Sequence, residues 1–376
     1  MRSSRRVIVP VMAAGLLLSA WGGTTAQSPS AAAPAECDYT NATPVNVQLQ
    51  WVTQAQFAGF FAAKDMCFYA NHGINATLIE ADPTGTPPQV IGSDPNGPQF
   101  TLAWVPKVLE LRDKGESDLV NIAQSFQRSG TLSLAWADSG IDSVDDYAGK
   151  IIGVWPFGNE YEVTAAIKAA GIPDDGWTKA DQFFTMEPFL KHEMDTAMAM
   201  TYNEYAQVLE TTNPDTGELY QPEDLNVINY NDVGTAMLQD AVWAREAWLA
   251  EEGNTDLATQ FLAATFEGWQ YCRDNADSCV QIVNDNGSIL GLGHQAWMMN
   301  EVNKLVWPAE GGIGSIPQAT WDQTVQISLD AGIITKEPDA AASRADLADA
   351  ARAMLTGDVT GDSFVPAEVP ITPNGE

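Results

Sequence analysis

Aromatic rings and side-chain amides follow directly after several apolar, strand-like segments of this 376-residue chain. Trp51 closes the apolar run that begins at Val45, and Gln54 and Gln56 come just after it. Ligands of open α/β sheets bind outside the carboxyl ends of the strands, so side chains at these positions are candidates for one shared site. The candidate ligand-binding residues chosen in this way are Trp51, Gln54, Gln56, Phe57, Trp104, Gln127, Trp155, Phe157, Gly158, Asn159, Glu160, Tyr202, Asn203 and Glu204.

This set of side chains suits a planar nitrogen heterocycle as the ligand. Each contact between two aromatic rings contributes about 0.5–1.5 kcal/mol beyond the area that it buries. A micromolar site needs about 8 kcal/mol in total, so hydrogen bonds to the edge of the ligand must supply the rest. Glu204 could form charge-assisted bonds to a ring N–H and an exocyclic amine. The alternative for Glu204 is a structural place at a helix N-terminus, and the alternative for any single Trp is core packing.

Charge favours a neutral or cationic ligand over an anionic one and argues against several partners. The chain carries a formal net charge of −32, which repels nucleic-acid phosphates and anionic lipid surfaces. The segment from Phe157 to Glu160 offers an amide and a carboxyl but no Ser or Thr hydroxyl for a phosphate or sulfonate group. With only three His and no cysteines at zinc-ligand spacing, we expect neither a metal site nor a cofactor.

Strand-like and helix-like segments alternate along the chain, which predicts an α/β fold. The expected strands are residues 45–51, 75–80, 99–104, 119–123, 132–137, 150–154, 181–185, 196–200, 225–228 and 236–243. The expected helices are residues 57–71, 106–114, 144–149, 160–170, 245–251, 255–273 and 279–285. Because 376 residues exceed what one hydrophobic core usually fills, we expect two lobes.

The second lobe is expected to be inserted into the first. The predicted bounds are residues 45–138 and 238–352 for the two parts of the first lobe and 139–237 for the second. The chain would cross between the lobes near residues 138–140 and again near 237–240. The last segment, residues 353–376, is rich in Gly, Pro and Asp and is predicted to be a frayed tail.

The N-terminus is typical of an export signal, predicted at residues 1–26. Arg2, Arg5 and Arg6 precede an apolar run from Val7 to Leu18, which is too short to span a bilayer. Trp21 stands where a lipoprotein would carry its acylated Cys, so the mode of anchoring is left open. Residues 27–44 follow as a tether rich in Ser, Ala and Pro. We expect an exported protein, periplasmic or at the cell surface, with no membrane span in its mature part.

Four cysteines in an exported chain indicate disulfides, with three possible pairings. The spacing of Cys272 and Cys279 suits two helices joined by a short loop. Cys37 and Cys67 could then join the tether to the end of the first helix. We therefore expect the pairs Cys37–Cys67 and Cys272–Cys279.

The segment 49–74 resembles the first strand–helix–strand unit of solute-binding proteins of ABC importers, in the branch related to thiamine-pyrimidine synthases. Residues 124–130, 202–204 and 268–269 are similar to this branch as well. The resemblance implies a type II periplasmic-binding-protein fold, whose two lobes close on a ligand about a hinge. It also implies a monomer that captures a thiamine pyrimidine precursor and delivers it to an ABC permease and ATPase. Related members resemble riboflavin binders, and riboflavin is the open alternative.

The synthase relatives use a Lys that binds pyridoxal phosphate and a nearby His, both after the third strand. This chain has Ala103 at the position of that Lys and no His nearby, and residues 233–238 lack the Cys of the relatives' iron segment. Lys107, at a helix start, is expected to be solvated, and His72, His192 and His294 are expected at the surface. We therefore expect no enzyme activity. The remaining alternatives are a receptor for another nitrogenous or sulfonated compound, and a sensor or adhesion protein.

Overall fold

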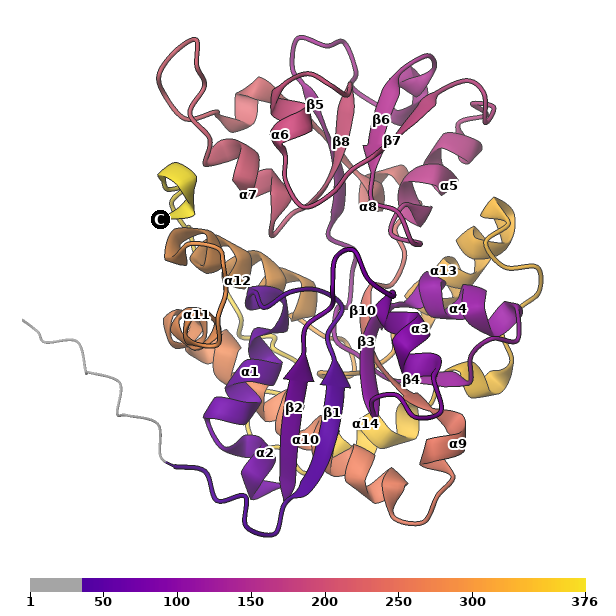
Figure 1. The fold of residues 1–376 in the computed structure, drawn as a ribbon, viewed down its shortest axis with the longest axis vertical. Helices are drawn as coiled ribbons and strands as arrows, with labels where there is room; N and C mark the ends of the chain where they lie inside the picture. The colour runs from indigo at the N-terminus through magenta and orange to yellow at the C-terminus, as the bar shows by residue number, and fades with distance from the viewer. Residues whose placement is uncertain (1–35) are drawn as a thin grey trace, which may run out of the picture. The chain divides into compact units, whose positions relative to one another are not determined.

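The computed structural model describes residues 36–376. The predicted export signal at 1–26 and the part of the predicted tether before residue 36 lie outside the described residues. Within residues 36–376, no helix is long and apolar enough to cross a bilayer. The same residues form two five-stranded sheets with helices packed around them, so the expected α/β class is confirmed (Figure 1).

The first sheet has the strand order β2-β1-β3-β10-β4, in which only β10 runs antiparallel to its neighbours. Its strands are β1 (Thr43–Gln48), β2 (Ile74–Ile79), β3 (Phe100–Trp104), β4 (Leu119–Gln124) and β10 (Asp240–Arg245). Every residue of β3 and β10 is buried, as expected for central strands covered on both faces. The edge strand β4 is fully buried as well.

The second sheet has the order β7-β6-β8-β5-β9, with β5 antiparallel to both of its neighbours. Its strands are β5 (Thr131–Trp136), β6 (Ile151–Val154), β7 (Thr178–Asp181), β8 (Thr196–Met200) and β9 (Leu225–Asn229). The expected boundary at 138/139 is wrong, because β5 pairs with β8 and β9 and so belongs to the second lobe. All six residues of β5 are buried, and an apolar run of this kind does not tell which sheet a strand joins.

Helices cover the faces of both sheets (Figure 1). They are α1 (Ala58–Asp65), α2 (Phe68–Asn71), α3 (Pro88–Ser93), α4 (Val105–Asp113), α5 (Tyr161–Ala169), α6 (Glu187–Leu190), α7 (Glu204–Leu209), α8 (Tyr230–Val233), α9 (Glu246–Leu249), α10 (Asn254–Asp274), α11 (Ala276–Asp285), α12 (Leu292–Val306), α13 (Gln318–Ala331) and α14 (Ala345–Arg352). Short 3-10 helices are η1 (Ala55–Phe57), η2 (Val144–Tyr147), η3 (Pro222–Asp224), η4 (Ala340–Ala342) and η5 (Pro373–Gly375). The sequence did not predict α3, α6, α7, α8, α12, α13 or α14.

The helix expected at residues 57–71 is divided, because Cys67 adopts a left-handed conformation (φ 65°) between α1 and α2. Cys67 is bonded to Cys37, and Cys272 at the end of α10 is bonded to Cys279 in α11. Both expected disulfides are therefore confirmed. Helix α10 also packs closely on α1, where a Cβ added to Gly268 would lie 2.0 Å from the carbonyl oxygen of Gly59.

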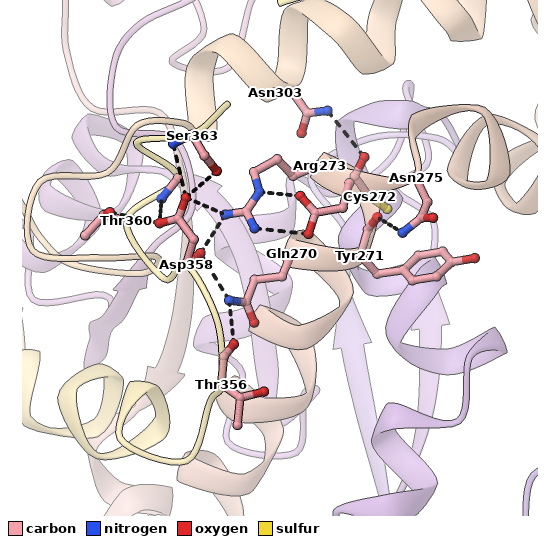
Figure 2. Close-up of polar contacts among 12 residues, drawn as sticks. Gln270, Tyr271, Cys272, Arg273, Asn275, Asn303, Thr356, Asp358, Thr360 and Ser363 are labelled. Atoms are coloured by element: carbon pink, nitrogen blue, oxygen red, sulfur yellow. Dashed lines mark hydrogen bonds and ion pairs between the residues drawn. The ribbon is translucent and has the colours of Figure 1, made fainter. Parts of the chain in front are cut away.

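The segment predicted to be a frayed tail is instead bound to the first lobe. Figure 2 shows Asp358 in the turn that follows α14, with its carboxylate accepting from the Ser363 hydroxyl at 2.6 Å and from the Gly361 amide at 2.8 Å. Arg273 of α10 donates to the Asp358 carbonyl at 2.6 Å. Composition rich in Gly, Pro and Asp reflects this turn chemistry, in which Asp closes loops onto backbone amides.

Two segments join the lobes, residues 125–130 between β4 and β5 and residues 234–239 between α8 and β10. Glu162 of α5 binds both: Oε2 accepts from the Ser129 hydroxyl at 2.8 Å, and Oε1 accepts from the Met237 amide at 2.8 Å. Burial raises the pKa of Glu162 to about 7. Two short crossings held by one side chain fit a two-segment hinge.

Candidate functional site

A cleft of about 260 Å³ lies between the two lobes, where the carboxyl ends of β1, β3, β6 and β8 face one another. Its lining comes from both lobes and consists of Gln50, Trp51, Gln54, Gln56, Pro83, Thr84, Trp104, Trp155, Pro156, Phe157, Asn159, Gln182, Phe183, Phe184, Met200, Tyr202, Asn203 and Glu204. The strand-end rule thus brings together Trp51, Gln54, Gln56, Trp104, Trp155, Phe157, Asn159, Tyr202, Asn203 and Glu204 of the predicted set.

Aromatic rings dominate this lining. Trp51 of the first lobe stacks on Phe184 of the second, with ring centroids 6.3 Å apart and planes inclined by 20°. Tyr202, at the end of β8, is buried and contacts Phe126 edge-on at 6.0 Å. Phe157 is 56% exposed, so its ring lies at the mouth of the cleft. Rings of both lobes therefore surround the same space.

The amides of the first lobe form a buried row. Gln54 Nε2 donates to Gln56 Oε1 at 2.7 Å, and Gln56 Nε2 donates to Asp240 Oδ2 at 2.6 Å. Gln295 of α12 holds the turn that carries Gln54 and Gln56, because its Oε1 accepts from the Ala55 amide at 2.7 Å. Burial raises the pKa of Asp240 to about 6, against the opposing effect of the hydrogen bond from Gln56.

Glu204 lines the second-lobe side of the cleft and also begins α7. Its Oε2 accepts from the Met200 amide at 2.9 Å, and its Oε1 accepts from Asn203 Nδ2 at 3.0 Å. Burial raises the pKa of Glu204 to about 7. The structural alternative is therefore confirmed, because this carboxyl begins α7 and binds the backbone of its own loop. Its role in binding a ligand stays a prediction.

Lys107 is buried and not solvated as expected, with 2% of its surface exposed. Its Nζ donates to Asn159 Oδ1 of the second lobe at 3.1 Å and lies 5.9 Å from the Trp104 ring centroid. Burial lowers the pKa of Lys107 to about 8. The expectation was wrong because α4 begins directly after β3, and this places its first turn beneath the 156–160 loop.

His294 is buried as well, contrary to the surface position expected for it. Its Nδ1 lies 2.9 Å from a carboxylate oxygen of Glu210, and its Nε2 lies 3.0 Å from Asn203 Oδ1. Because His294 belongs to α12 and both partners belong to the second lobe, this group joins the two lobes beside the cleft. Within residues 36–376, no group of His, Cys, Asp and Glu could hold a metal ion.

Four predicted residues lie outside the cleft lining. Phe57 is fully buried in the core of the first lobe. Gln127 donates to the carbonyls of Gln124 and Ser315, and Glu160 accepts from the Gly158 amide and from Lys179. Each of these side chains is used by the local loop or core, and Gly158 has no side chain and adopts a φ of 86° that suits the turn.

Most of the cleft-lining residues that the sequence did not predict lie in a segment expected to be a strand or in a long connection. Gln182, Phe183 and Phe184 follow β7, which ends at Asp181, whereas residues 181–185 were predicted as strand. Pro83 and Thr84 belong to the long connection after β2. A strand end placed four residues earlier would have added the first group by the same rule. The other missed residues are Gln50, Pro156 and Met200.

Two α/β lobes with a ligand-sized cleft between them define the periplasmic-binding-protein class, and solved structures agree. The ligand-binding component of an ABC-type import system from Staphylococcus aureus is similar with a TM-score of 0.59 and 9% identity, over 81% of this chain and 97% of that one. The periplasmic aliphatic sulphonate binding protein SsuA from Escherichia coli is similar with a TM-score of 0.58 and 14% identity, over 79% and 90%. The expected periplasmic-binding-protein fold is confirmed.

Sequence comparison places the chain in one family within this fold class. The profile of the NMT1/THI5-like family matches residues 54–278, and the chain belongs to that family. The riboflavin-binding protein RibY of Chloroflexus aurantiacus (strain ATCC 29366 / DSM 635 / J-10-fl) is 23% identical over 340 residues, which cover 86% of this chain and 92% of RibY. The resemblance noted in the sequence is therefore confirmed at the level of the family.

An enzyme shares this fold too. The desulfurization enzyme DSZB is similar with a TM-score of 0.52 and 12% identity, over 82% of this chain and 99% of that one. The fold alone therefore does not separate binding from catalysis, which depend on the side chains of the cleft.

Proposed function

We propose that this protein is the extracytoplasmic substrate-binding protein of an ABC importer and that its cleft captures an uncharged, planar nitrogen heterocycle. The observation that carries the proposal is the position of Trp51, Trp104, Trp155 and Tyr202 around one cleft, with two of these rings from each lobe. Rings from the two lobes can stack on both faces of a flat ligand when the lobes close on it. The partners would be a permease and an ATPase, and the protein would act as a monomer.

The charges near the cleft support an uncharged ligand. None of the residues that line it is Lys or Arg, and the nearby Lys107 ammonium already donates to Asn159. An anionic head group would therefore meet no free cation in the lining, and it would approach a chain of net charge −32. A phosphate or sulfonate ligand is disfavoured on both grounds.

Riboflavin is the first ligand to test, and a thiamine pyrimidine precursor is the second. A single pyrimidine ring has two faces, whereas Trp51, Trp104, Trp155, Phe184 and Tyr202 all line the cleft. A fused three-ring system offers more face for these side chains. RibY, a riboflavin-binding protein by name, is among the relatives. An aminopyrimidine would leave part of this aromatic lining without a contact.

The side chains favour binding over catalysis. The lining has amides and one carboxyl, Glu204, both of whose oxygens already accept hydrogen bonds. It contains no Ser, Cys or His, so the Ser–His and Cys–His pairs of common hydrolytic sites are missing from the lining. Lys107 and Asp240 are buried behind the cleft and interact with neighbouring side chains.

A titration with two ligands tests this proposal. Purified protein is titrated against riboflavin, followed by flavin fluorescence, and against 4-amino-5-hydroxymethyl-2-methylpyrimidine, followed by calorimetry. We expect a dissociation constant of about 1 μM or less for one of them. Trp155→Ala should weaken that binding about tenfold, because one stacking partner worth about 1 kcal/mol and its buried area are lost. Trp177→Ala, outside the lining, is the matched control. Binding of neither ligand contradicts the proposal.

A further inference from the structure

The buried row of Gln54, Gln56 and Asp240 has a fixed direction. An ionised carboxylate can only accept hydrogen bonds, so Gln56 must turn its Nε2 toward Asp240 Oδ2, at 2.6 Å. Gln56 Oε1 then faces Gln54 and accepts from its Nε2 at 2.7 Å. As a result, Gln54 is left with its oxygen unused. The carboxylate at one end of the row thereby decides which atom the other end offers.

The Gln54 oxygen is an acceptor without a donor. Gln54 lines the cleft with 1% of its surface exposed, and among the described residues its Oε1 has no hydrogen-bond partner. Leaving a buried amide oxygen unpaired costs about 1–3 kcal/mol. Buried polar atoms are almost always paired in native proteins, so this unpaired oxygen is suited to accept a hydrogen bond from a ligand's N–H.

The second lobe offers a matching acceptor. Gln182 Nε2 donates to the Met198 carbonyl at 2.7 Å, which commits the amide nitrogen to the protein. Gln182 is also 1% exposed and lines the cleft, and within the described part of the chain its Oε1 has no partner. Each lobe therefore presents one amide oxygen whose orientation is set by a hydrogen bond to the protein.

We propose that Asp240 is a positioning residue that sets the hydrogen-bond polarity of the cleft, so that Gln54 Oε1 accepts from a ring N–H of the ligand and Gln182 Oε1 accepts from a second N–H or O–H donor. This inference rests on the proposed function, because it specifies the edge of the same heterocycle. We assign the ring N–H to Gln54 since it lies in the lobe of Trp51 and Trp104, whose indoles would hold the ring. Cyclic imides carry such a ring N–H, and an aminopyrimidine would offer an N–H of its exocyclic amine to Gln54 Oε1 instead.

Protonation of Asp240 would reverse the row. A neutral carboxyl can donate to Gln56 Oε1, after which Gln56 would donate to Gln54 and the Gln54 nitrogen would face the cleft. Burial raises the pKa of Asp240 to about 6. The charged or polar groups that face this carboxyl are Lys107, the Tyr202 hydroxyl, the Gln56 amide and the Trp104 indole N–H. Preference for an N–H donor should therefore weaken below about pH 6.

The test compares ligands that differ only in the ring N–H. Riboflavin and 3-methylriboflavin are titrated against the full chain at pH 8. Methylation should weaken binding to the native protein about tenfold or more, as expected when a fixed buried acceptor loses its donor. The amide that Asp240→Asn introduces can present either an oxygen or a nitrogen to Gln56. In this variant the dissociation constants of 3-methylriboflavin and riboflavin should differ by no more than about threefold, and their ratio is the quantity compared between variants. Asp322→Asn, which removes one exposed carboxylate on α13, should keep the native ratio.

Two measurements separate the possible failures. Near-ultraviolet circular dichroism and the midpoint of thermal unfolding establish that Asp240→Asn is folded, and Gln54→Leu serves as a second variant that should also lose the ratio. A folded Asp240→Asn that keeps the native ratio overturns this inference and leaves the proposed function intact. Absence of binding by the native protein to both riboflavin and the aminopyrimidine overturns the proposed function itself. If the pyrimidine is the ligand, its 4-amino and 4-dimethylamino forms replace the flavin pair.

Discussion

Three buried ionisable side chains form hydrogen bonds that join the lobes or the two segments between them. Lys107 bonds to Asn159 across the cleft, and Glu162 ties the two crossing segments together. His294 faces Glu210 and Asn203 of the opposite lobe. All three are buried ionisable groups, and such groups need partners to offset the loss of water. Each is therefore sensitive to changes in the distance between the lobes.

We predict that Lys107→Met weakens ligand binding about three- to tenfold without unfolding the protein. The substitution keeps the buried aliphatic stem but removes the hydrogen bond from Nζ to Asn159, which is worth about 1 kcal/mol. Because that bond joins the lobes, its loss should disfavour the closed form. Calorimetric titration with the ligand gives the affinity, and Lys336→Met on the surface is the control. Equal affinities for native and variant protein would refute a closing role for Lys107.

Three buried carboxyls should make the protein less stable as pH rises from 5 to 7.5. Burial raises the pKa of Glu162 and Glu204 to about 7 and that of Asp240 to about 6. A raised pKa means that the folded state holds its proton where the unfolded state has lost it. The resulting stability is present below about pH 4 and is lost as pH climbs through 6 to 7.

Glu162→Gln tests this pH dependence. The change should reduce the fall in unfolding free energy between pH 5 and 7.5 by up to about 3 kcal/mol, because one of the raised carboxyls is gone. Urea unfolding at several pH values measures it, with Glu337→Gln as a surface control. A native protein whose stability is flat or rising across this interval contradicts the assignment of raised pKa values.

At the scale of elements, the two disulfides should differ in what they contribute. Cys37–Cys67 closes a separation of 30 residues and Cys272–Cys279 one of 7. Loop-closure entropy predicts losses of about 4 and about 2 kcal/mol when each is removed. Thermal unfolding of Cys37→Ser/Cys67→Ser and Cys272→Ser/Cys279→Ser measures both. A larger loss for the shorter loop would show that contacts between α10 and α11, and not chain entropy, decide the order.

Helix packing supplies a second prediction at this scale. Gly268 of α10 faces the Gly59 carbonyl so closely that an added Cβ would lie 2.0 Å from its oxygen. Gly268→Ala should therefore force α1 and α10 apart and destabilise the protein by about 1–3 kcal/mol. Gly115→Ala has open space around the new Cβ but a strained φ of 74°, so it separates backbone strain from steric overlap. A Gly268→Ala variant as stable as the native protein would contradict the close helix contact.

The sequence predicts most elements but not all of their partners. Apolar runs bounded by turns place nine of the ten described strands within a few residues, and the central strands β3, β8 and β10 are buried throughout. The second-lobe strand β7, which carries one partly buried and three exposed residues, was placed late. Strand pairing is a non-local property, so the sequence does not predict which of the two sheets β5 joins. Helices α12 and α13 mix polar and apolar residues, and their pattern was missed.

The candidate site was partly predictable for the same reason. Strand ends are local features, so the rule found rings and amides that the fold brings to one cleft. It could not tell which of those side chains turn inward, and Gln127 and Glu160 bond to their own loops instead. Lys107 and His294 were misplaced because their burial depends on the opposite lobe. Contacts between lobes are the part that residue patterns do not encode.

At the scale of the whole described chain, the C-terminal segment contacts both lobes. The C-terminal segment bonds to the first lobe through Asn300, whose Oδ1 accepts from the Ala367 amide at 2.8 Å, and to the second through the Asn374 amide, which donates to the Glu210 carbonyl at 2.9 Å. Figure 1 shows this end of the chain beside α7 and α12. Closure on a ligand would therefore involve the C-terminal segment as well as the two crossings.

A crystal structure of the protein grown with riboflavin, or with the aminopyrimidine if that is the ligand that binds, tests the central claim most directly. We expect a flat ring system between the lobes, in contact with Trp51 or Trp104 on one side and with Trp155 or Tyr202 on the other. We also predict that a ligand N–H, the ring N–H of riboflavin or an exocyclic amine N–H of the aminopyrimidine, lies within hydrogen-bonding distance of Gln54 Oε1. A ligand held by one lobe alone, or bound outside this cleft, would contradict the account.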